Sequence, residues 1–188
     1  MTDIYNNNCT DCDLCIKRKI IVRGNGNPNA DIMIMGEAPA YHEDTKGQPF
    51  VGKAGKLLNH TLDKCGFTRD DVYTTNVVKC RPPKNRQPTM IELAACAKYL
   101  KQELINVKPK ILLLLGATAA KTVFAKADIR ISDIRGYAID YKGYIVIPTY
   151  HPSAVLRDPT KVERFFNDFK LLVTKYRSNV DSLHITNY

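Results

Sequence analysis

Four cysteines in two pairs carry the most distinctive chemistry of this sequence. Cys9 and Cys12 lie close together near the N-terminus, and Cys80 and Cys96 follow farther along the chain. Four thiolates from two chain segments can hold a zinc ion or a 4Fe–4S cluster, and their spacing alone does not choose between the two. Cys96 also falls on an apolar helical stripe, so taken alone it fits a core cysteine equally well.

The two remaining cysteines have different surroundings. Cys15 repeats the spacing of the first pair and could be a spare or competing ligand. Cys65 lies on the apolar side of a helical pattern over 53–65 and fits an inert core cysteine. The first residues lack the basic-then-apolar pattern of a secretion signal, so we expect a protein that stays inside the cell, where disulfides are disfavoured.

A carboxylate and an aromatic ring form the second group of candidates. The segment Gly36-Glu37-Ala38-Pro39-Ala40 ends a short apolar run, and Glu43 lies just beyond it. A carboxylate held between glycine and proline at the end of a strand is well placed for catalysis, although an ordinary strand–loop junction looks the same. Phe50 lies in the glycine-rich stretch 47–55, where it could stack on a base or fold into the core.

An asparagine and a basic loop form the third group. Asn76 lies near the end of the predicted strand 72–78, which is rich in Val, Thr and Tyr, and its amide could pair with the Watson–Crick edge of a base. The following loop carries four cations that suit phosphates, namely Lys79, Arg81, Lys84 and Arg86. The net charge of +9 favours nucleic acid as a partner. A solvated basic loop and solubility alone would explain the same features.

A histidine that directly follows a predicted strand is the fourth candidate. The segment 151–157 has the sequence His-Pro-Ser-Ala-Val-Leu-Arg. Its position on the rim of the expected ligand crevice makes His151 a candidate for binding or catalysis. His42, His60 and His184 lack this setting, and we take them as ordinary structural residues.

Strand and helix patterns alternate along the chain. We predict strands over 31–36, 72–78, 111–115, 137–140 and 144–148, and helices over 53–65, from the capping box at 89–92 to Pro109, from 116 onward, and over 161–176. This alternation favours a single α/β domain over 1–188, with a parallel sheet covered on both faces. We expect loops over 1–19, 37–52 and 79–88, and a loose polar tail over 178–188.

The carboxyl ends of parallel strands meet at one edge of a sheet, and ligands bind there. The loops at this edge begin at Gly36, Lys79, Gly116 and Pro148. Three of them carry the candidates described above, whereas the Gly116 loop is expected to be only structural. The longest apolar run, 111–115, is far too short to cross a membrane.

In this order, the segments resemble family 4 uracil-DNA glycosylases, the iron–sulfur branch of the uracil-DNA glycosylase superfamily. The resemblance covers about 9–176 and rests on the first cysteine pair, 36–55, 75–89, Cys96 and 151–157. It implies a three-layer α/β/α sandwich around a central, mainly parallel four-stranded sheet. It also implies an enzyme that flips uracil out of DNA and hydrolyses its N-glycosidic bond, the first step of base excision repair.

The resemblance assigns a cofactor as well. It makes Cys9, Cys12, Cys80 and Cys96 the ligands of a 4Fe–4S cluster, with zinc as the less favoured occupant. Family members usually lack a cysteine at the place of Cys15. They usually have glycine where this chain has Ala40, which we expect to tighten the mouth of the pocket. The basic, histidine-bearing insertion of the branch that traps uracil covalently does not follow Arg81.

Roles in base recognition and chemistry follow from the resemblance. Phe50 would stack on the flipped uracil, and Asn76 would recognise its N3–H and O4. Glu43 would face the C5 edge and exclude the methyl group of thymine. His151 and the backbone N–H of Ala38 would stabilise the negative charge at O2 as the uracil anion leaves. Glu37 would position water or stabilise the sugar cation, and Asn85 would assist.

DNA contacts follow in the same way. The backbone would be held by five cations, which are Lys79, Arg81, Lys84, Arg86 and Arg157. Val155 or Leu156 would wedge into the stack that the base leaves. We expect an intracellular monomer in the cytoplasm or beside the nucleoid, with no membrane association. Uracil-containing DNA is its substrate, and a replication or repair protein is a possible partner.

Two other functions fit parts of the pattern. A non-catalytic member of the same fold could bind DNA or a replication protein without cutting. A zinc-bound nucleic-acid module could use the cysteines without having a base pocket. Release of free uracil and analysis of the bound metal separate these alternatives from the enzyme.

Overall fold

A six-stranded sheet forms the centre of the computed structural model, which describes residues 4–185, with side chains through Asn179. The strand order is β1-β3-β2-β4-β6-β5. The bounds are β1 (Asn25–Gly26), β2 (Ile32–Gly36), β3 (Val72–Asn76), β4 (Ile111–Leu115), β5 (Ile139–Tyr141) and β6 (Tyr144–Thr149). The four inner strands run parallel, and the two short edge strands pair antiparallel. The predicted parallel sheet is thus confirmed, but it has six strands rather than the four that the resemblance implies, because a short antiparallel strand is added at each edge.

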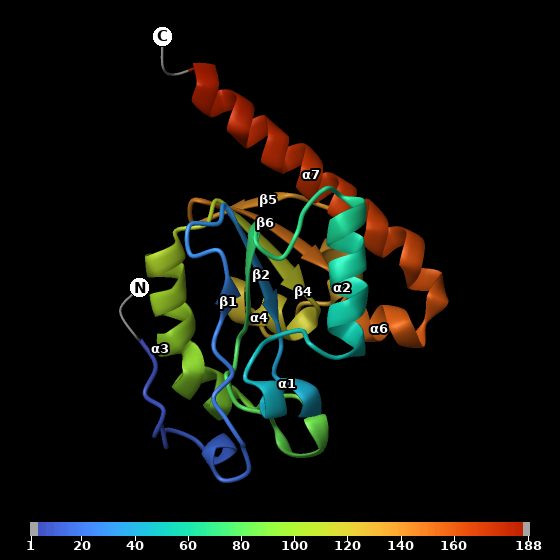
Figure 1. The fold of residues 1–188 in the computed structure, drawn as a ribbon. Helices are drawn as coiled ribbons and strands as arrows, with labels where there is room; N and C mark the ends of the chain where they lie inside the picture. The colour runs from blue at the N-terminus through green and yellow to red at the C-terminus, as the bar shows by residue number, and fades with distance from the viewer. Residues whose placement is uncertain (1–3, 186–188) are drawn as a thin grey trace.

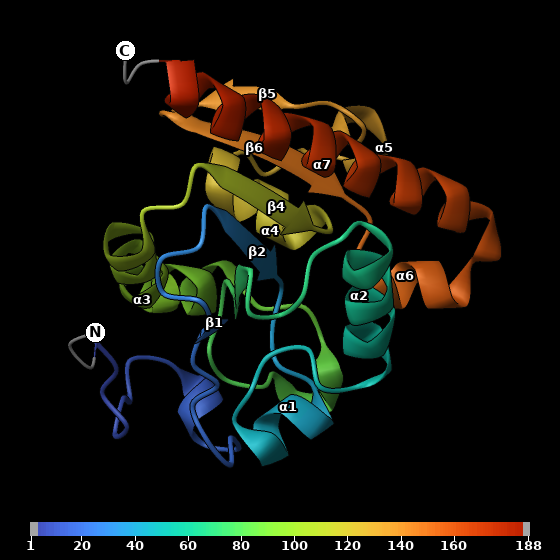
Figure 2. The same cartoon turned by 45° about the horizontal axis from the view of Figure 1, so that its top comes forward.

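Helices cover both faces of the sheet. Their bounds are α1 (Tyr41–Lys46), α2 (Lys53–Lys64), α3 (Met90–Val107), α4 (Ala117–Phe124), α5 (Ile131–Ile134), α6 (Pro152–Arg157) and α7 (Val162–Ile185). Three short 3-10 turns join them, η1 (Asp13–Cys15), η2 (Pro83–Asn85) and η3 (Pro159–Lys161). In Figure 1, α2, α6 and α7 lie on one side of the sheet and α3 on the other. Figure 2 shows α4 beneath the sheet and α7 above it. This arrangement confirms the predicted α/β/α sandwich.

Strand periodicity divides the core into two layers. Along β2, Ile32 and Ile34 lie in one core cluster with Phe165 and Phe169 of α7, whereas Met33 and Met35 pack with residues of α3 and α4. Successive side chains of a strand point to opposite faces, so a strand inside a covered sheet must be apolar throughout. All five residues of β2 are buried. The sheet is therefore a rigid base for the loops at its carboxyl edge.

Several local predictions are wrong. The predicted loop 37–52 contains α1, and the segment after His151 forms α6. α7 continues to Ile185, where a loose tail was expected from Ser178. The polar composition indicated a tail, but Ser178 Oγ donates to Thr174 O at 3.0 Å and the helix continues. Residues 1–3 of the predicted N-terminal loop and 186–188 of the predicted tail lie outside the described residues, as does the side chain of His184.

Among the described residues, no helix is both long enough and apolar enough to cross a bilayer.

A buried ion pair joins α7 to the segment after α5, and Thr149 of β6 ties the same carboxylate to the sheet. Asp168 on α7 accepts from Arg135 Nε at 2.9 Å and from Thr149 Oγ1 at 2.6 Å. We predict that Arg135→Met lowers the free energy of unfolding by about 3 kcal/mol, because it leaves a buried carboxylate without its cation. Urea denaturation measures this loss.

The exposed pair of Lys110 and Asp31 provides the control. Lys110→Met should cost less than about 1 kcal/mol, because solvent screens that pair. Equal, small losses for the two variants would contradict an anchoring role for Arg135.

Candidate active site and cysteine cavity

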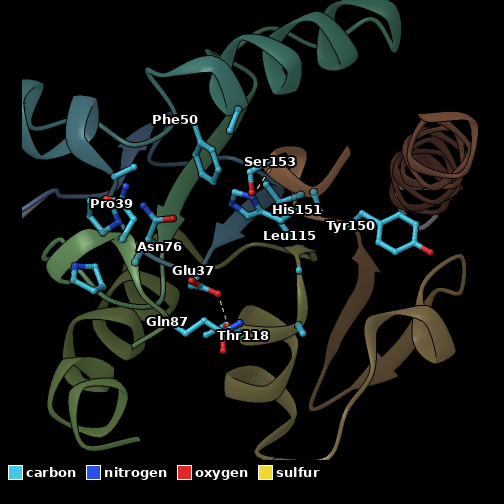
Figure 3. Close-up of a pocket in the computed structure, with 18 of the residues that line it drawn as sticks. Glu37, Pro39, Phe50, Asn76, Gln87, Leu115, Thr118, Tyr150, His151 and Ser153 are labelled. Carbon is cyan, nitrogen blue, oxygen red and sulfur yellow. Dashed lines mark hydrogen bonds between the residues drawn. The ribbon is translucent and has the colours of Figure 1, made fainter. Parts of the chain in front are cut away.

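A cavity of about 510 Å³ opens at the carboxyl edge of the parallel strands. It gathers nine of the predicted site residues, namely Glu37, Ala38, Glu43, Phe50, Asn76, Asn85, Arg86, His151 and Arg157. In Figure 3, the side chains of Phe50, Asn76, Glu37 and His151 surround a common space although they come from different segments. The structure therefore places the three separate sequence motifs in one site.

Phe50 and Asn76 converge above Gly36, the last residue of β2. A Cβ atom at Gly36 would lie 2.4 Å from Asn76 Oδ1 and 2.6 Å from Phe50 Cζ, so this position accepts no side chain. Phe50 has a φ of 57°. Its carbonyl oxygen lies 1.7 Å from where a Cβ of Gly55 would be, so α2 fits against Phe50 only through a glycine. Only 6% exposed, Phe50 both belongs to the core and forms a wall of the cavity.

Glu43 braces the loop that carries Phe50. Its carboxylate accepts from the backbone N–H groups of Val51 at 3.1 Å and Gly52 at 3.0 Å, and from that of Ala40 at 3.2 Å. The acid thus has a structural task besides lining the cavity. Ala40 has a φ of −99°, which any residue adopts, so alanine is unstrained there.

Glu37 has a partner that sequence analysis missed. Thr118 Oγ1, at the start of α4, donates to Glu37 Oε2. The Gly116 loop is therefore part of the site, and the expectation that it is only structural is wrong. Thr118 is an unremarkable residue type in an ordinary helix start. The only available signal was that its loop follows a central parallel strand.

His151 caps the N-terminus of α6. Its Nδ1 accepts from the backbone N–H of Ser153 at 3.2 Å, so a neutral ring carries its proton on Nε2. Burial, and to a smaller extent the nearby Arg157, together lower the pKa of His151 to about 4, against a still smaller opposing effect of Glu43. At neutral pH the ring is thus an uncharged donor. Its centroid lies 6.3 Å from that of Phe50.

Two predicted DNA contacts are wrong. Lys79 is only 1% exposed, and its Nζ pairs with Glu103 Oε2 at 2.6 Å, so it cannot reach a phosphate. Val155 is 3% exposed because it lies on the inner side of α6 and packs in the core. The neighbouring Leu156, 51% exposed, is the wedge candidate that remains.

The basic loop is internally braced. Arg81 Nε donates to Asn85 Oδ1 at 2.7 Å, and the guanidinium carbon lies 5.3 Å from the ring centroid of Tyr41. Arg86 pairs with Glu92, near the start of α3, at 2.6 Å. Lys84 is exposed. Arg81 and Arg86 therefore hold the cavity rim in shape as well as carrying charge.

A second, small cavity gathers the four predicted metal ligands. Cys9, Cys12, Cys80 and Cys96 all line it, whereas Cys15 does not. Arg18 Nη1 donates to Cys80 Sγ at 3.7 Å, and the backbone N–H of Lys79 donates to Cys96 Sγ at 3.3 Å.

Burial raises the pKa of the Cys80 thiol to about 12 and raises those of Cys12 and Cys96. A bound cation would oppose these shifts, because it stabilises thiolates. Among the described side chains, those of residues 4–179, no three of Cys, His, Asp or Glu lie close enough together to hold a single metal ion.

Comparison with known proteins identifies the family. The model of the uracil DNA glycosylase superfamily matches residues 23–174. The chain belongs to this superfamily. It is 44% identical over 169 residues to a type-4 uracil-DNA glycosylase of Archaeoglobus fulgidus, covering 86% of this chain and 85% of the relative. It is 45% identical over 151 residues to the Thermotoga maritima protein of the same name, covering 80% and 79%. The superfamily fold agrees with the sandwich described above.

The protonation of His151 is directly testable. We predict that its imidazole titrates with a midpoint of about 4, against 6.5 in an unfolded chain. Between these values the unfolded chain binds more protons, so stability falls as the pH falls through this window. Histidine NMR signals, assigned with His151→Gln, measure the midpoint. A midpoint of 6 or above would contradict the buried, neutral ring.

Proposed function

We propose that this protein flips uracil out of DNA and hydrolyses the bond between the base and its sugar. One observation carries the proposal: a single cavity brings together the aromatic ring of Phe50, the amide of Asn76, the carboxylate of Glu37 and a neutral His151. The type-4 names of the similar proteins support the same activity.

Uracil would be recognised by the groups around Gly36. Phe50 stacks on the extruded ring, an interaction of about 1–3 kcal/mol. Asn76 accepts from N3–H through Oδ1 and donates to O4. Cytosine reverses both bonds, so discrimination requires an amide that does not rotate, and the 96% buried setting of Asn76 supports this. Glu43 excludes the thymine methyl at the C5 edge.

The N-glycosidic bond breaks with its electron pair leaving on uracil. Negative charge develops at O2, where His151 Nε2–H and the backbone N–H of Ala38 donate hydrogen bonds. Water supplies the oxygen that bonds to C1′ of the sugar, and the proton that this water loses neutralises the uracil anion. Glu37, oriented by Thr118, positions that water or stabilises the sugar cation. Asn85, held by Arg81, assists from the rim.

Residues at the cavity rim would hold the DNA while its uracil is flipped out. Extrusion costs a few kcal/mol. Lys84 and Arg157 are the exposed cations that contact phosphates, while Arg81 and Arg86 add charge from braced positions. Leu156 fills the vacated stack. This affinity falls as the salt concentration rises.

The cysteine cavity would hold a 4Fe–4S cluster on Cys9, Cys12, Cys80 and Cys96. A single zinc ion requires ligand sulfurs about 3.8 Å apart, from Zn–S bonds of about 2.3 Å. A cluster spreads its thiolates more widely, which suits four cysteines that line one cavity from separate segments of the chain. The cluster supplies a covalent tie between the N-terminal loop and the Cys80–Cys96 segment, and so shapes the basic loop.

The enzyme would act inside the cell, on the DNA that contains its substrate. A replication or repair protein partner is compatible with this role. The alternative is a non-catalytic DNA-binding member of the fold. It gives no role to the Glu37–Thr118 pair or to the neutral histidine.

Uracil release tests the activity. We predict that the protein frees uracil from an oligonucleotide with one deoxyuridine, and that His151→Ala slows release about 100- to 1000-fold, because it removes one donor to O2. Chromatography of the free base under single-turnover conditions measures both. DNA binding without release would establish the non-catalytic alternative, and a near-normal rate for the variant would exclude His151 as the donor.

Iron analysis tests the cluster. We predict iron, acid-labile sulfide and visible absorbance in the purified protein. Cys96→Ala should lose them, whereas Cys15→Ala should retain them because Cys15 does not line the cavity. Stoichiometric zinc without iron, or loss of iron in Cys15→Ala, would contradict the assignment.

A further inference from the structure

A buried lysine lies between the two functional centres. Lys79 Nζ contacts Glu103 Oε2 at 2.6 Å, Thr75 Oγ1 at 2.6 Å and the backbone carbonyl of Asn76 at 2.7 Å. Both charged side chains are at most 1% exposed. A lysine ammonium has three protons, and these three acceptors use all of them.

The acid of this pair is itself held by several donors. Glu103 on α3 accepts from Thr75 Oγ1 at 2.9 Å and from the backbone N–H of Gly24 at 3.2 Å. Tyr5 and Tyr73 also donate to it. The position of Lys79 is therefore fixed from α3, from β3 and from the N-terminal segment, and the ammonium has little freedom to move.

The same residue contacts both centres. Its ammonium bonds the carbonyl of Asn76, the residue proposed to recognise uracil, and its backbone N–H donates to Cys96 Sγ at 3.3 Å. Asn76 ends β3, and the peptide that follows it is already held on one side, because the backbone N–H of Val77 donates to Gly36 O at 3.0 Å. A charge-assisted bond to the carbonyl is a strong way to hold this last peptide.

We propose that Lys79 is a positioning residue that fixes the main chain of Asn76, and thereby the direction of its amide, and that it connects this amide to the cysteine cavity. This inference rests on the proposed function, because it specifies how the uracil-recognising side chain is oriented. The alternative is an ion pair that only attaches α3 to the sheet. That alternative predicts a general loss of stability without a specific effect on Asn76.

A double-mutant cycle distinguishes the positioning role of Lys79 from an ion pair that only attaches α3 to the sheet. Lys79→Met/Glu103→Met removes both buried charges together, which is better tolerated than removing one. We expect this change to lower kcat/KM for the uracil oligonucleotide at least tenfold when Asn76 is present, and less than twofold in the Asn76→Ala background. Equal losses in both backgrounds would overturn the proposal, because residues acting through one another are not additive.

Two further measurements complete the test. The side-chain amide NMR signals of Asn76, assigned by their loss in Asn76→Ala, should shift in the Lys79→Met/Glu103→Met variant; unchanged signals would overturn the proposal. If that variant does not fold, Lys79→Gln is used in the same cycle with the same criteria. Failure of the unmodified protein to release uracil would reject the proposed function, whereas release with additive losses would reject only the role of Lys79.

Discussion

The site depends on the absence of a side chain at Gly36. β2 ends there, and the ring of Phe50 and the amide of Asn76 approach so closely that a Cβ atom at this position would collide with both. Two groups from distant parts of the chain can therefore contact one flat base, the ring of Phe50 on its face and the amide of Asn76 at its edge. The other elements maintain this approach: Gly55 lets α2 fit against the Phe50 backbone, and Glu43 holds the loop between them.

Electrostatics at the site follow from burial rather than from strong charges. His151 is kept neutral by desolvation, and the bond from Ser153 to its Nδ1 leaves the proton on the side available to a ligand. A neutral donor is suited to a leaving group that becomes an anion only as the bond breaks, because it does not demand a charge in the ground state. In the proposed reaction, the Glu37 carboxylate is assigned to the sugar, where the developing charge is positive.

Much of this arrangement could be predicted from local patterns. Short apolar or β-branched runs indicate the four inner strands, and the box formed by Thr89 and Glu92 marks the start of α3 correctly. Asn76 lies near the end of a predicted strand, Phe50 lies in a glycine-rich stretch, and His151 directly follows a predicted strand, which makes each of them a candidate. The topology of a parallel sheet then required them to meet at one edge.

The misses share a different cause. Nothing near Lys79 in sequence indicates that Glu103, on another element, would neutralise it and bury it. Val155 and Leu156 are adjacent and alike in composition, yet α6 buries one and exposes the other. Thr118 has no distinguishing neighbours. Such features depend on contacts between elements, and a linear pattern contains no information about partners of this kind.

Two causes lower the pKa of His151, and their relative size has a consequence for substrate binding. Burial is the largest cause of its low proton affinity, and the positive charge of Arg157 comes second. A phosphate that docks on Arg157 would offset only the second of these contributions. Burial, the larger one, would remain and would continue to favour the uncharged imidazole.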